Sequence, residues 1–274
     1  MAQQCSISVA VVLYNRRCED SPTCMALAKL TDRPLTVLIH DNSTSDFGIR
    51  EFCDARGWIY LGGNGNAGIS KAYNACVDYL KTHHRTELLC LFDDDTQLEA
   101  RYFSRLEKAR RETGCRILLP LIFAKDRLLS PCLLTEGHRV TRFPDAEAAL
   151  NYRGDRISAI NSGMALALSL FDNYRYDENI FLDGVDHHFM MDMRRKGEKA
   201  AVFSYRCDHD FSGASLPEKG SALNRFRIYT KDYSYILKDR KTAYCRLVGK
   251  RALKLALQYR SGEFMKVFFN SLSR

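Results

Sequence analysis

Short apolar runs and longer amphipathic segments alternate along the first half of the chain. The apolar runs lie at residues 7–14, 36–40 and 88–92, and the first of them is rich in β-branched residues. Such near-continuous runs are typical of strands buried on both faces of a parallel sheet. Helix-length segments separate them, at about residues 21–30, 48–56 and 67–81. The alternation predicts an α/β fold with a parallel sheet and right-handed crossovers.

The second half of the chain is less regular. Strands are predicted at residues 116–122, 157–161 and 199–205, and helices at 186–196 and 225–237. No linker rich in proline or glycine divides the chain before about residue 215, so we expect one shared core. We therefore divide the chain into a main domain, residues 1–223, and a helical extension, residues 224–274. The main domain has two halves, about 1–115 and 116–223.

Polar residues follow each of the three clearest strands. Asn15 ends the first, Asp41 ends the second, and the acidic triplet of Asp93, Asp94 and Asp95 ends the third. In open α/β sheets, ligands bind at the carboxyl ends of the strands. These polar strand ends therefore predict a single binding site.

The acidic triplet stands directly after a buried apolar run. Three adjacent carboxylates repel one another unless a positive charge is bound, and a divalent cation carried by a nucleotide diphosphate supplies one. Oxygen ligands suit Mg²⁺ or Mn²⁺. The alternative is an acidic cap on the first turn of a helix, where Asp and Glu are favoured.

A glycine-rich segment at residues 62–68 contains a GxGxxG pattern, formed by Gly63, Gly65 and Gly68. This pattern matches the dinucleotide-binding fingerprint, but its context does not, because that fingerprint belongs to the first strand-to-helix turn. Here two strands come first. We interpret the segment as a loop whose backbone closely approaches a phosphate or a base.

Composition and cysteine usage narrow the class of protein. The chain is 46% hydrophobic and 27% charged, as expected of a globular protein with a sizeable core. Its ten cysteines include no CxxC pair, so we expect reduced, buried thiols and no zinc site. No apolar run approaches the roughly 20 residues that span a bilayer, and the N-terminus lacks a signal-peptide pattern. We expect a cytoplasmic protein.

The positive charge is concentrated at the end of the chain. Residues 224–274 hold 13 Lys and Arg against three acidic residues, whereas the whole chain carries only +8. Such asymmetry indicates an anionic partner, either a membrane or a nucleic acid.

On a helix, Arg246, Lys250 and Lys254 would share one face, and the opposite face would be mainly apolar. The apolar positions are Val248, Ala252, Leu255 and Tyr259, with Leu253 and Leu257 interrupting the pattern. The helix either lies on anionic lipid or docks on the main domain.

Six motifs in a fixed order resemble those of the family 2 glycosyltransferases, which have a GT-A fold. The motifs are VAVVLYN, TVLIHDNSTSD, GNGNAGISKAYNA, LLCLFDDDT, NSGMAL and YDENIFLDGVDHHFMMDMRRKG, followed by His209. The chain looks most like the rhamnosyltransferase-type branch, which builds bacterial surface polysaccharides. The resemblance covers about residues 6–235. It implies a GT-A catalytic domain over 1–223, with a nucleotide-binding half and an acceptor half, and a basic helical extension.

The resemblance also implies roles for residues of the nucleotide-binding half. Asp41 would contact the nucleobase, with Asn15 beside the nucleotide. Asp93 would lie near the ribose and Asp95 on the metal, while Asp94 fills a variable middle position. His209 would lie near the metal and the leaving diphosphate. The loop and helix beside the base and diphosphate would contribute Asn66, Gly68, Lys71 and Asn74.

The acceptor half carries a second acidic site. Inverting transfer needs a carboxylate that removes the proton of the acceptor hydroxyl. Asp186 matches the position of this base in the family, and Asp183 is the second choice, although either residue could simply cap the helix that follows. The turn formed by Asn161, Ser162 and Gly163 resembles the acceptor-side turn of the family, with an ordinary β-turn as the alternative.

The resemblance implies an inverting, metal-dependent glycosyltransferase that uses Mn²⁺ or Mg²⁺. The expected donor is dTDP-rhamnose, and the acceptor a saccharide or a lipid-linked saccharide of bacterial polysaccharide or O-antigen synthesis. A lipid-linked acceptor would place the protein at the inner face of the cell membrane. One alternative is a transferase of UDP-linked GlcNAc, Gal or galactofuranose. Another is a nucleotide- or nucleic-acid-binding protein without transferase activity, although no nucleic-acid partner is expected because no such motif is present.

Overall fold

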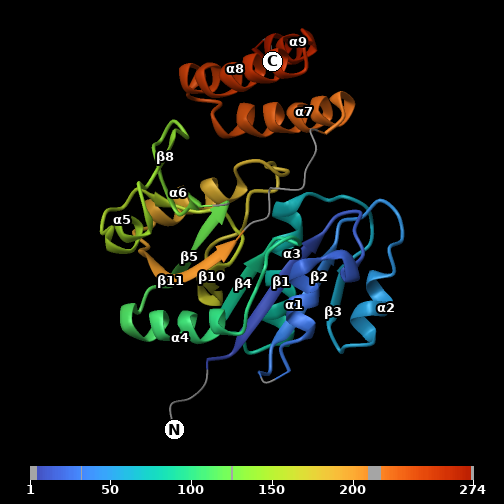
Figure 1. Cartoon of the computed structure of the whole chain (residues 1–274), viewed down its shortest axis with the longest axis vertical. Helices are drawn as coiled ribbons and strands as arrows, with labels where there is room; N and C mark the ends of the chain where they lie inside the picture. The colour runs from blue at the N-terminus through green and yellow to red at the C-terminus, as the bar shows by residue number, and fades with distance from the viewer. Residues whose placement is uncertain (1–4, 32, 125, 209–216, 273–274) are drawn as a thin grey trace.

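The computed structural model describes residues 5–31, 33–124, 126–208 and 217–272. A central sheet has the strand order β11-β5-β10-β4-β1-β2-β3, with β6 paired to β5. Helices flank this sheet (Figure 1). The strands are β1 (Ile7–Leu13), β2 (Thr36–Asp41), β3 (Ile59–Gly62), β4 (Leu88–Phe92), β5 (Ile117–Ala124), β6 (Arg127–Ser130), β10 (Met164–Ala167) and β11 (Ala200–Asp208).

The first four strands are parallel, and the sheet becomes mixed toward its other edge. β1 pairs in parallel with both β2 and β4, so Val9 stands opposite Val37 on one side and Cys90 on the other. β10 is antiparallel to both β4 and β5, and β11 is parallel to β5. The predicted parallel α/β sheet is therefore confirmed as a mixed, mostly parallel one.

Helix boundaries in the first half follow local capping signals. The Ser21 hydroxyl accepts a hydrogen bond from the Cys24 N–H, and Pro22 occupies the first turn, so α1 begins there. α4 ends at Gly114, which adopts the left-handed conformation. α3 packs against β1, β2 and β3, and α4 against β5 and β11. These helices are α1 (Pro22–Ala28), α2 (Ile49–Asp54), α3 (Ile69–His83) and α4 (Arg101–Thr113), with a 3₁₀ turn, η1 (Cys18–Asp20), before α1.

The second half of the main domain adds a small second sheet with the order β8-β7-β9. Its predicted strand at 157–161 is only two residues long, and β10 was not predicted. The elements of this half are β7 (Cys132–Leu134), β8 (Val140–Arg142), α5 (Ala146–Asn151), β9 (Ile157–Ser158), η2 (Leu168–Asp172) and α6 (Val185–Arg195).

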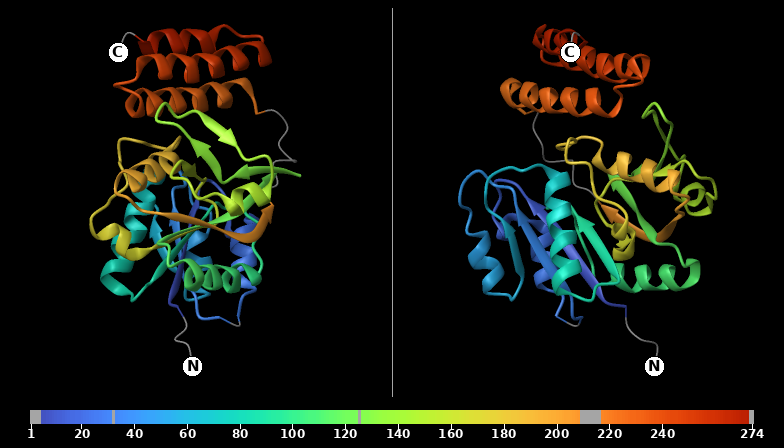
Figure 2. Two further views of the ribbon diagram at one scale, coloured as in Figure 1. Left: turned by 90° about the vertical axis from the view of Figure 1, so that its left-hand side faces the viewer. Right: turned by 180° about the vertical axis from the view of Figure 1, so that it is seen from behind.

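Three helices complete the chain: α7 (Lys219–Ile236), α8 (Lys241–Gln258) and α9 (Glu263–Leu272). They form a separate hydrophobic cluster around Phe226, Val248 and Phe264. α7 lies between the main domain and the other two helices (Figures 1 and 2). The boundary expected after residue 223 falls inside α7, because Ala222 and Leu223 already pack within this cluster.

The three-helix cluster is docked on the main domain. The loop between β7 and β8 reaches it, where Glu136 forms ion pairs with Arg194 of α6 and with Arg240 before α8. α7 itself contacts the segment that leads into α6, as described below. Val248 and Ala252 of α8 are buried within this cluster, so the apolar side of α8 packs against α7 and α9.

Two further expectations concern cysteines and membrane-spanning segments. All ten cysteines are free thiols, and seven of them are buried, as expected of small apolar residues in a reduced protein. No helix in the described part of the chain is both long and apolar enough to cross a bilayer. Trp58 packs edge-on against Phe52, with ring centroids 5.6 Å apart, which agrees with a core role.

Candidate active site

The ends of β1 and β2 are joined by Asn15. Its backbone adopts a left-handed conformation, with φ of 49°, and its N–H donates to the Ser43 hydroxyl at 2.9 Å. Its side-chain oxygen accepts a hydrogen bond from the Thr44 N–H, also at 2.9 Å. Asn15 therefore fixes the two strand ends relative to each other and remains exposed beside them.

A polar cavity of about 460 Å³ opens at the ends of β2 and β3, with Asp41 in its lining. Asp41 accepts a hydrogen bond from the Ser43 N–H at 2.8 Å and one from the Tyr60 hydroxyl at 2.9 Å. Burial and this bond raise the pKa of Tyr60 to about 12, so Tyr60 remains a protonated donor. The Arg50 guanidinium lies over the Tyr60 ring, 4.1 Å from its centroid. The cavity thus presents a carboxylate held by a tyrosine, which suits a ligand with N–H donors.

The backbone of the glycine-rich segment passes so close to other parts of the protein that two of its glycines leave no room for a side chain. Gly62 has φ of 89°, and a Cβ there would lie 2.4 Å from the Asp41 carbonyl oxygen. Gly68 has φ of 87°, and a Cβ there would lie 2.6 Å from the Phe181 ring. Contacts within the chain therefore account for the glycines at positions 62 and 68 without a bound phosphate or base. The side chain of Asn66 caps its turn by accepting a hydrogen bond from the Gly68 N–H at 3.1 Å.

The acidic triplet forms a turn after β4 that α1 holds in place. The Thr23 hydroxyl donates to the Asp93 carbonyl at 2.6 Å, and the Ser21 hydroxyl donates to the Asp94 carbonyl at 2.6 Å. The Asp94 carboxylate pairs with Arg16 at 3.3 Å. Burial raises the pKa of Asp94 to about 6, with Arg16 opposing this shift and the two neighbouring carboxylates adding to it. A bound cation would relieve this concentration of negative charge.

The turn at Asn161, Ser162 and Gly163 lies directly against the acidic turn. The hydroxyls of Ser162 and Thr96 are hydrogen-bonded to each other. The Gly163 N–H donates to the Leu91 carbonyl at 2.7 Å, and the Tyr102 hydroxyl donates to the Gly163 carbonyl at 2.8 Å. All three residues of the turn are buried. The structure thus brings together two motifs that lie about 65 residues apart in the sequence.

Asp186 lies in the first turn of α6 and accepts a hydrogen bond from the His187 N–H at 2.7 Å. Burial raises the pKa of its carboxyl, the adjacent His187 opposes this shift, and the negative charges of Asp93 and Asp183 add to it. The two acidic sites are therefore close enough to interact electrostatically. A raised pKa brings a carboxylate nearer to the basicity that suits a general base.

Asp183 is engaged in a different way. Both of its carboxylate oxygens accept hydrogen bonds from the Arg225 guanidinium of α7, one of them at 2.9 Å. A bidentate pair of this kind occupies both carboxylate oxygens. Of the two candidate bases, the geometry favours Asp186.

The two histidines after Asp186 make separate contacts. His187 is hydrogen-bonded through Nδ1 to the Ser158 hydroxyl at 2.8 Å, and His188 lies 3.5 Å from Asp192. They therefore do not converge on one ion, as expected for adjacent positions on a helix. His209, the expected ligand beside the metal, lies outside the described residues.

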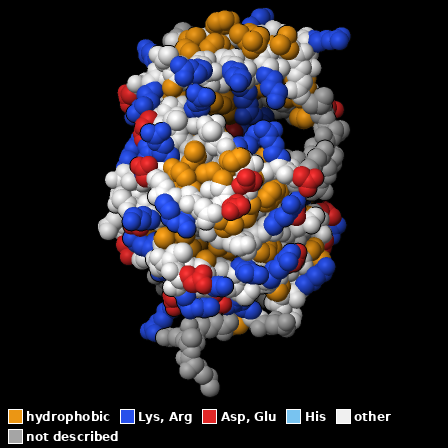
Figure 3. Space-filling model, turned by 60° about the vertical axis from the view of Figure 1, so that its left-hand side comes forward, with side chains coloured by type: hydrophobic (Ala, Val, Ile, Leu, Met, Phe, Trp, Pro, Cys, Tyr) orange, Lys and Arg blue, Asp and Glu red, His pale blue; other side chains and the backbone are white. Residues whose placement is uncertain are grey.

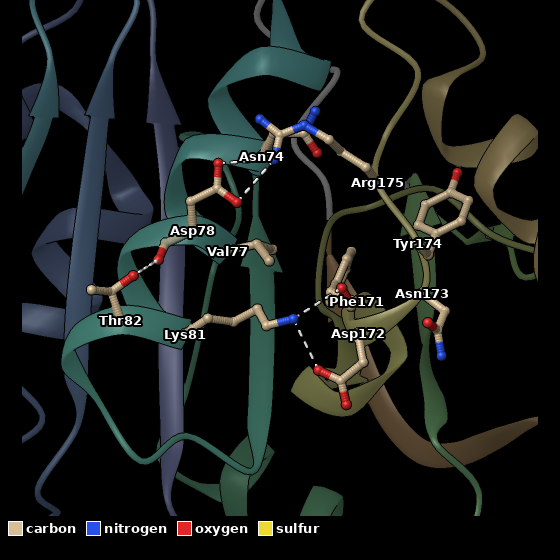
Figure 4. A pocket seen from close by; sticks show the side chains of 10 residues that line it. All are labelled: Asn74, Val77, Asp78, Lys81, Thr82, Phe171, Asp172, Asn173, Tyr174 and Arg175. Atoms are coloured by element: carbon tan, nitrogen blue, oxygen red, sulfur yellow. Dashed lines mark hydrogen bonds and ion pairs between the residues drawn. The ribbon is translucent and has the colours of Figure 1, made fainter.

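Asn74 and Lys71 of α3 lie away from the cavity at Asp41. The Asn74 side chain bonds to the backbone N–H and carbonyl of Tyr176, both at 3.0 Å, which gives it a structural role. It lines a second cavity, of about 680 Å³, between α3 and residues 171–175 (Figure 4). There Lys81 pairs with Asp172 and Arg175 with Asp78. Lys71 is exposed on the same helix.

Metal binding by the acidic turn would need ligands from outside the protein. Over residues 5–31, 33–124, 126–208 and 217–272, no group of three or more His, Cys, Asp or Glu side chains is arranged to hold an ion. The carboxylates of Asp93 and Asp95 nevertheless suit a hard cation. Mg²⁺ commonly binds through one or two carboxylates together with substrate phosphates and water. The donor set fits a cation that arrives with a nucleotide diphosphate.

The sequence did not single out several residues that shape the site. Tyr60 lies in the short strand β3, and nothing local in the sequence marks its bond to Asp41. Arg16 follows Asn15 directly, so a cation facing the acidic turn could have been proposed from the strand ends. Arg225 and Asp232 act on a segment about 50 residues away in the chain, and no spacing signals this contact.

The architecture, a mixed sheet with its polar site at the strand ends and an acidic turn after β4, is the GT-A fold of glycosyltransferases. No protein-family model matches the sequence, and no curated protein matches it. Solved structures match throughout most of the chain. The crystal structure of S. aureus TarS 1-349 in complex with UDP has a TM-score of 0.57 and 15% identity, covering 96% of this chain and 80% of that one.

GalNAc-T7 with UDP, GalNAc and Mn²⁺ has a TM-score of 0.59 and 11% identity, and the match covers 93% of this chain. This chain spans 55% of the GalNAc-T7 structure and 44% of another TarS structure, which matches with a TM-score of 0.53 and 15% identity. At these identities the likeness establishes the fold.

Proposed function

We propose that the protein is an inverting glycosyltransferase that takes a sugar from a nucleoside diphosphate donor. The observation that carries the proposal is the placement of Asp41 and the acidic turn on either side of β1. Because β2 and β4 both pair with β1, their ends lie two strand spacings apart, or roughly 10 Å. A nucleoside diphosphate bridges such a span, with its base at Asp41 and its phosphates at Asp93 and Asp95. The UDP and Mn²⁺ in the neighbouring structures support this assignment.

In the proposed reaction, Asp186 accepts the proton of an acceptor hydroxyl as the oxygen attacks the anomeric carbon. A new glycosidic bond forms as the bond from the anomeric carbon to the phosphate oxygen breaks. The nucleoside diphosphate leaves, and the configuration at the anomeric carbon of the transferred sugar is inverted. A divalent cation, when bound, would stabilise the negative charge of the leaving group. Asp93 and Asp95 would hold this cation, and Asn161, Ser162 and Gly163 would border the donor sugar. We propose dTDP-rhamnose as the donor, with UDP-sugars as the alternative.

Thermal-shift measurements with dTDP, UDP, GDP, ADP and NAD, each with and without Mn²⁺, test the donor site. Ligand that binds the folded state raises the melting temperature by mass action. We expect a Mn²⁺-dependent shift with dTDP or UDP, and its loss in Asp95→Ala. Asp54→Ala serves as the control, because Asp54 is an exposed carboxylate at the end of α2, before the start of β3 and so at the opposite edge of the sheet. A shift with NAD alone, or with none of these nucleotides, would contradict the proposal.

We further propose that the enzyme acts at the inner face of the cell membrane on a lipid-linked acceptor. The outer surface of α8 and α9 exposes four large apolar side chains, namely Leu253, Leu257, Phe269 and Leu272, with exposed fractions of 47 to 72%. Figure 3 places hydrophobic side chains at this end of the molecule, with Lys and Arg beside them. The exposed Arg246, Lys250 and Lys254 lie on α8 next to the two leucines. Apolar and basic side chains on one surface suit an anionic bilayer.

Sedimentation with vesicles tests the membrane proposal. The full chain should co-sediment with vesicles of phosphatidylcholine and phosphatidylglycerol at low salt, and much less with phosphatidylcholine alone or at high salt. The double variant Leu253→Gln and Leu257→Gln should reduce binding about 100-fold, since each leucine that is buried in the bilayer contributes roughly 1.5 kcal/mol and every 1.4 kcal/mol is about tenfold. Val140→Gln, which changes an exposed apolar residue of β8, should not. Equal sedimentation of all variants, or none at low salt, would overturn this proposal.

A further inference from the structure

The segment at residues 180–183 leads directly into α6 and its Asp186. On one side it is fixed to the first turn of α3, which follows the glycine-rich segment. The Ile69 N–H donates to the Phe181 carbonyl at 2.8 Å, and the Ser70 hydroxyl donates to the Ile180 carbonyl at 2.6 Å. These bonds hold the carbonyl groups of the segment and leave its N–H groups to other partners.

On the other side the segment is held by Asp232, in the middle of α7. The Asp232 side chain is fully buried, and its carboxylate accepts hydrogen bonds from three consecutive backbone N–H groups. The Phe181 N–H donates at 3.0 Å, the Leu182 N–H at 2.9 Å and the Asp183 N–H at 2.8 Å. A charged acceptor makes each of these bonds stronger than a neutral one.

Two neighbouring contacts attach the same segment to α7. The Asp183 carboxylate is paired with Arg225, which lies about two helical turns before Asp232 in α7. Gly184 has φ of 79°, and a Cβ at this position would lie 3.1 Å from both the Tyr233 hydroxyl and Ile236 Cδ1. Four consecutive residues before α6 therefore rest on α7, a helix that belongs to the basic extension.

We propose that Asp232 is a positioning residue: it fixes the backbone of residues 181–183 and so sets the place from which Asp186 faces the acceptor. This inference rests on the proposed function of Asp186 as the base. The segment has no regular secondary structure, so the three N–H groups have no ladder partners of their own. Without the carboxylate they would be left unsatisfied or would turn toward water, and α6 would enter at a different angle. A misplacement of about 1 Å can cost about 100-fold in rate.

Steady-state kinetics of Asp232→Asn test the proposal. The asparagine has the same shape, but its amide N–H₂ faces backbone donors, so at least one of the three bonds is lost. We expect kcat to fall about 10- to 100-fold, with the KM for the donor within about threefold and the UDP-induced thermal shift retained. Asp239→Asn is the matched control, because Asp239 is an exposed aspartate just beyond α7, and it should leave both constants unchanged. An unchanged kcat in Asp232→Asn would overturn the proposal.

Hydrogen exchange of the full-length protein separates this proposal from the proposed function. In Asp232→Asn, the amides of residues 181–183 should exchange at least about tenfold faster, while those of α8 and α9 keep their protection. Unchanged exchange at 181–183, or equal loss of protection throughout α7, α8 and α9, would overturn the positioning role. An inactive wild-type protein would count against the transferase assignment alone, because the exchange experiment needs no substrate.

Discussion

Replacing Asp186 with asparagine is expected to lower the rate of sugar transfer about 10²- to 10⁴-fold, the range that general-base catalysis contributes. The asparagine preserves the shape of the side chain and its bond to the His187 N–H, but it cannot accept the proton of the acceptor hydroxyl. Release of the nucleoside diphosphate reports the rate of transfer. It is measured with a sugar donor of the nucleotide that gives the Mn²⁺-dependent thermal shift. Binding of that nucleotide should be unchanged, because its proposed site lies at the ends of β2 and β4, whereas Asp186 lies in the first turn of α6.

Asp192→Asn is the control for this prediction, because Asp192 lies on the same helix and pairs with Arg195 near the surface. It should change the rate less than about twofold. The pH profile gives a second check. Asp186 acts as a base only when ionised, and burial raises its pKa, so wild-type activity should fall as the pH drops through this raised value. Near-normal rates in Asp186→Asn would show that Asp186 is not the general base and acts only at the start of α6.

Gly68→Ala is expected to lower the free energy of unfolding by about 3 kcal/mol. Gly68 combines φ of 87° with ψ of 164°, a conformation that only glycine adopts readily and that costs other residues about 1–3 kcal/mol. The added Cβ would also lie 2.8 Å from the Phe181 carbonyl oxygen and 2.6 Å from its ring, so the clash adds to the strain. Urea denaturation followed by fluorescence measures the change.

The matched control is Gly65→Ala in the same loop. Gly65 has a similar φ of 83°, but a Cβ there would meet no atom within 4 Å. Its substitution should cost only the conformational strain of a left-handed backbone, about 1 kcal/mol, so Gly68→Ala should be clearly the more destabilising of the two. Equal losses of stability in the two variants would show that the close approach contributes nothing.

The strands that were predicted and the one that was missed differ in how local their signals are. β1 and β2 are continuous apolar runs, and their parallel pairing follows from the helices between them. β10 has the sequence MALA, which contains no β-branched residue and favours helix. Its strand conformation is imposed by β4 and β5, which pair with it on both sides. Such a strand is specified by tertiary pairing and has no local signature.

The same distinction applies to the candidate site. Asp41 and the acidic triplet could be placed together from the sequence, because the ends of parallel strands share one edge of the sheet. The preference for Asp186 over Asp183 as the base came from the resemblance alone, and the pairing of Asp183 with Arg225, 42 positions away, could not be predicted. The role of α8 was left open for a similar reason: its apolar face is filled by α7 and α9, which only the packed structure reveals.

The bonds that hold residues 181–183 are made by main-chain N–H groups, and this has a consequence for which substitutions the segment tolerates. Any amino acid except proline supplies the N–H that Asp232 requires. The side chain at 182 can therefore be exchanged, by mutation or by design, while the three bonds to Asp232 stay the same. Libraries that randomise position 182 and exclude proline should therefore retain protection of these amides from hydrogen exchange in the variants that fold.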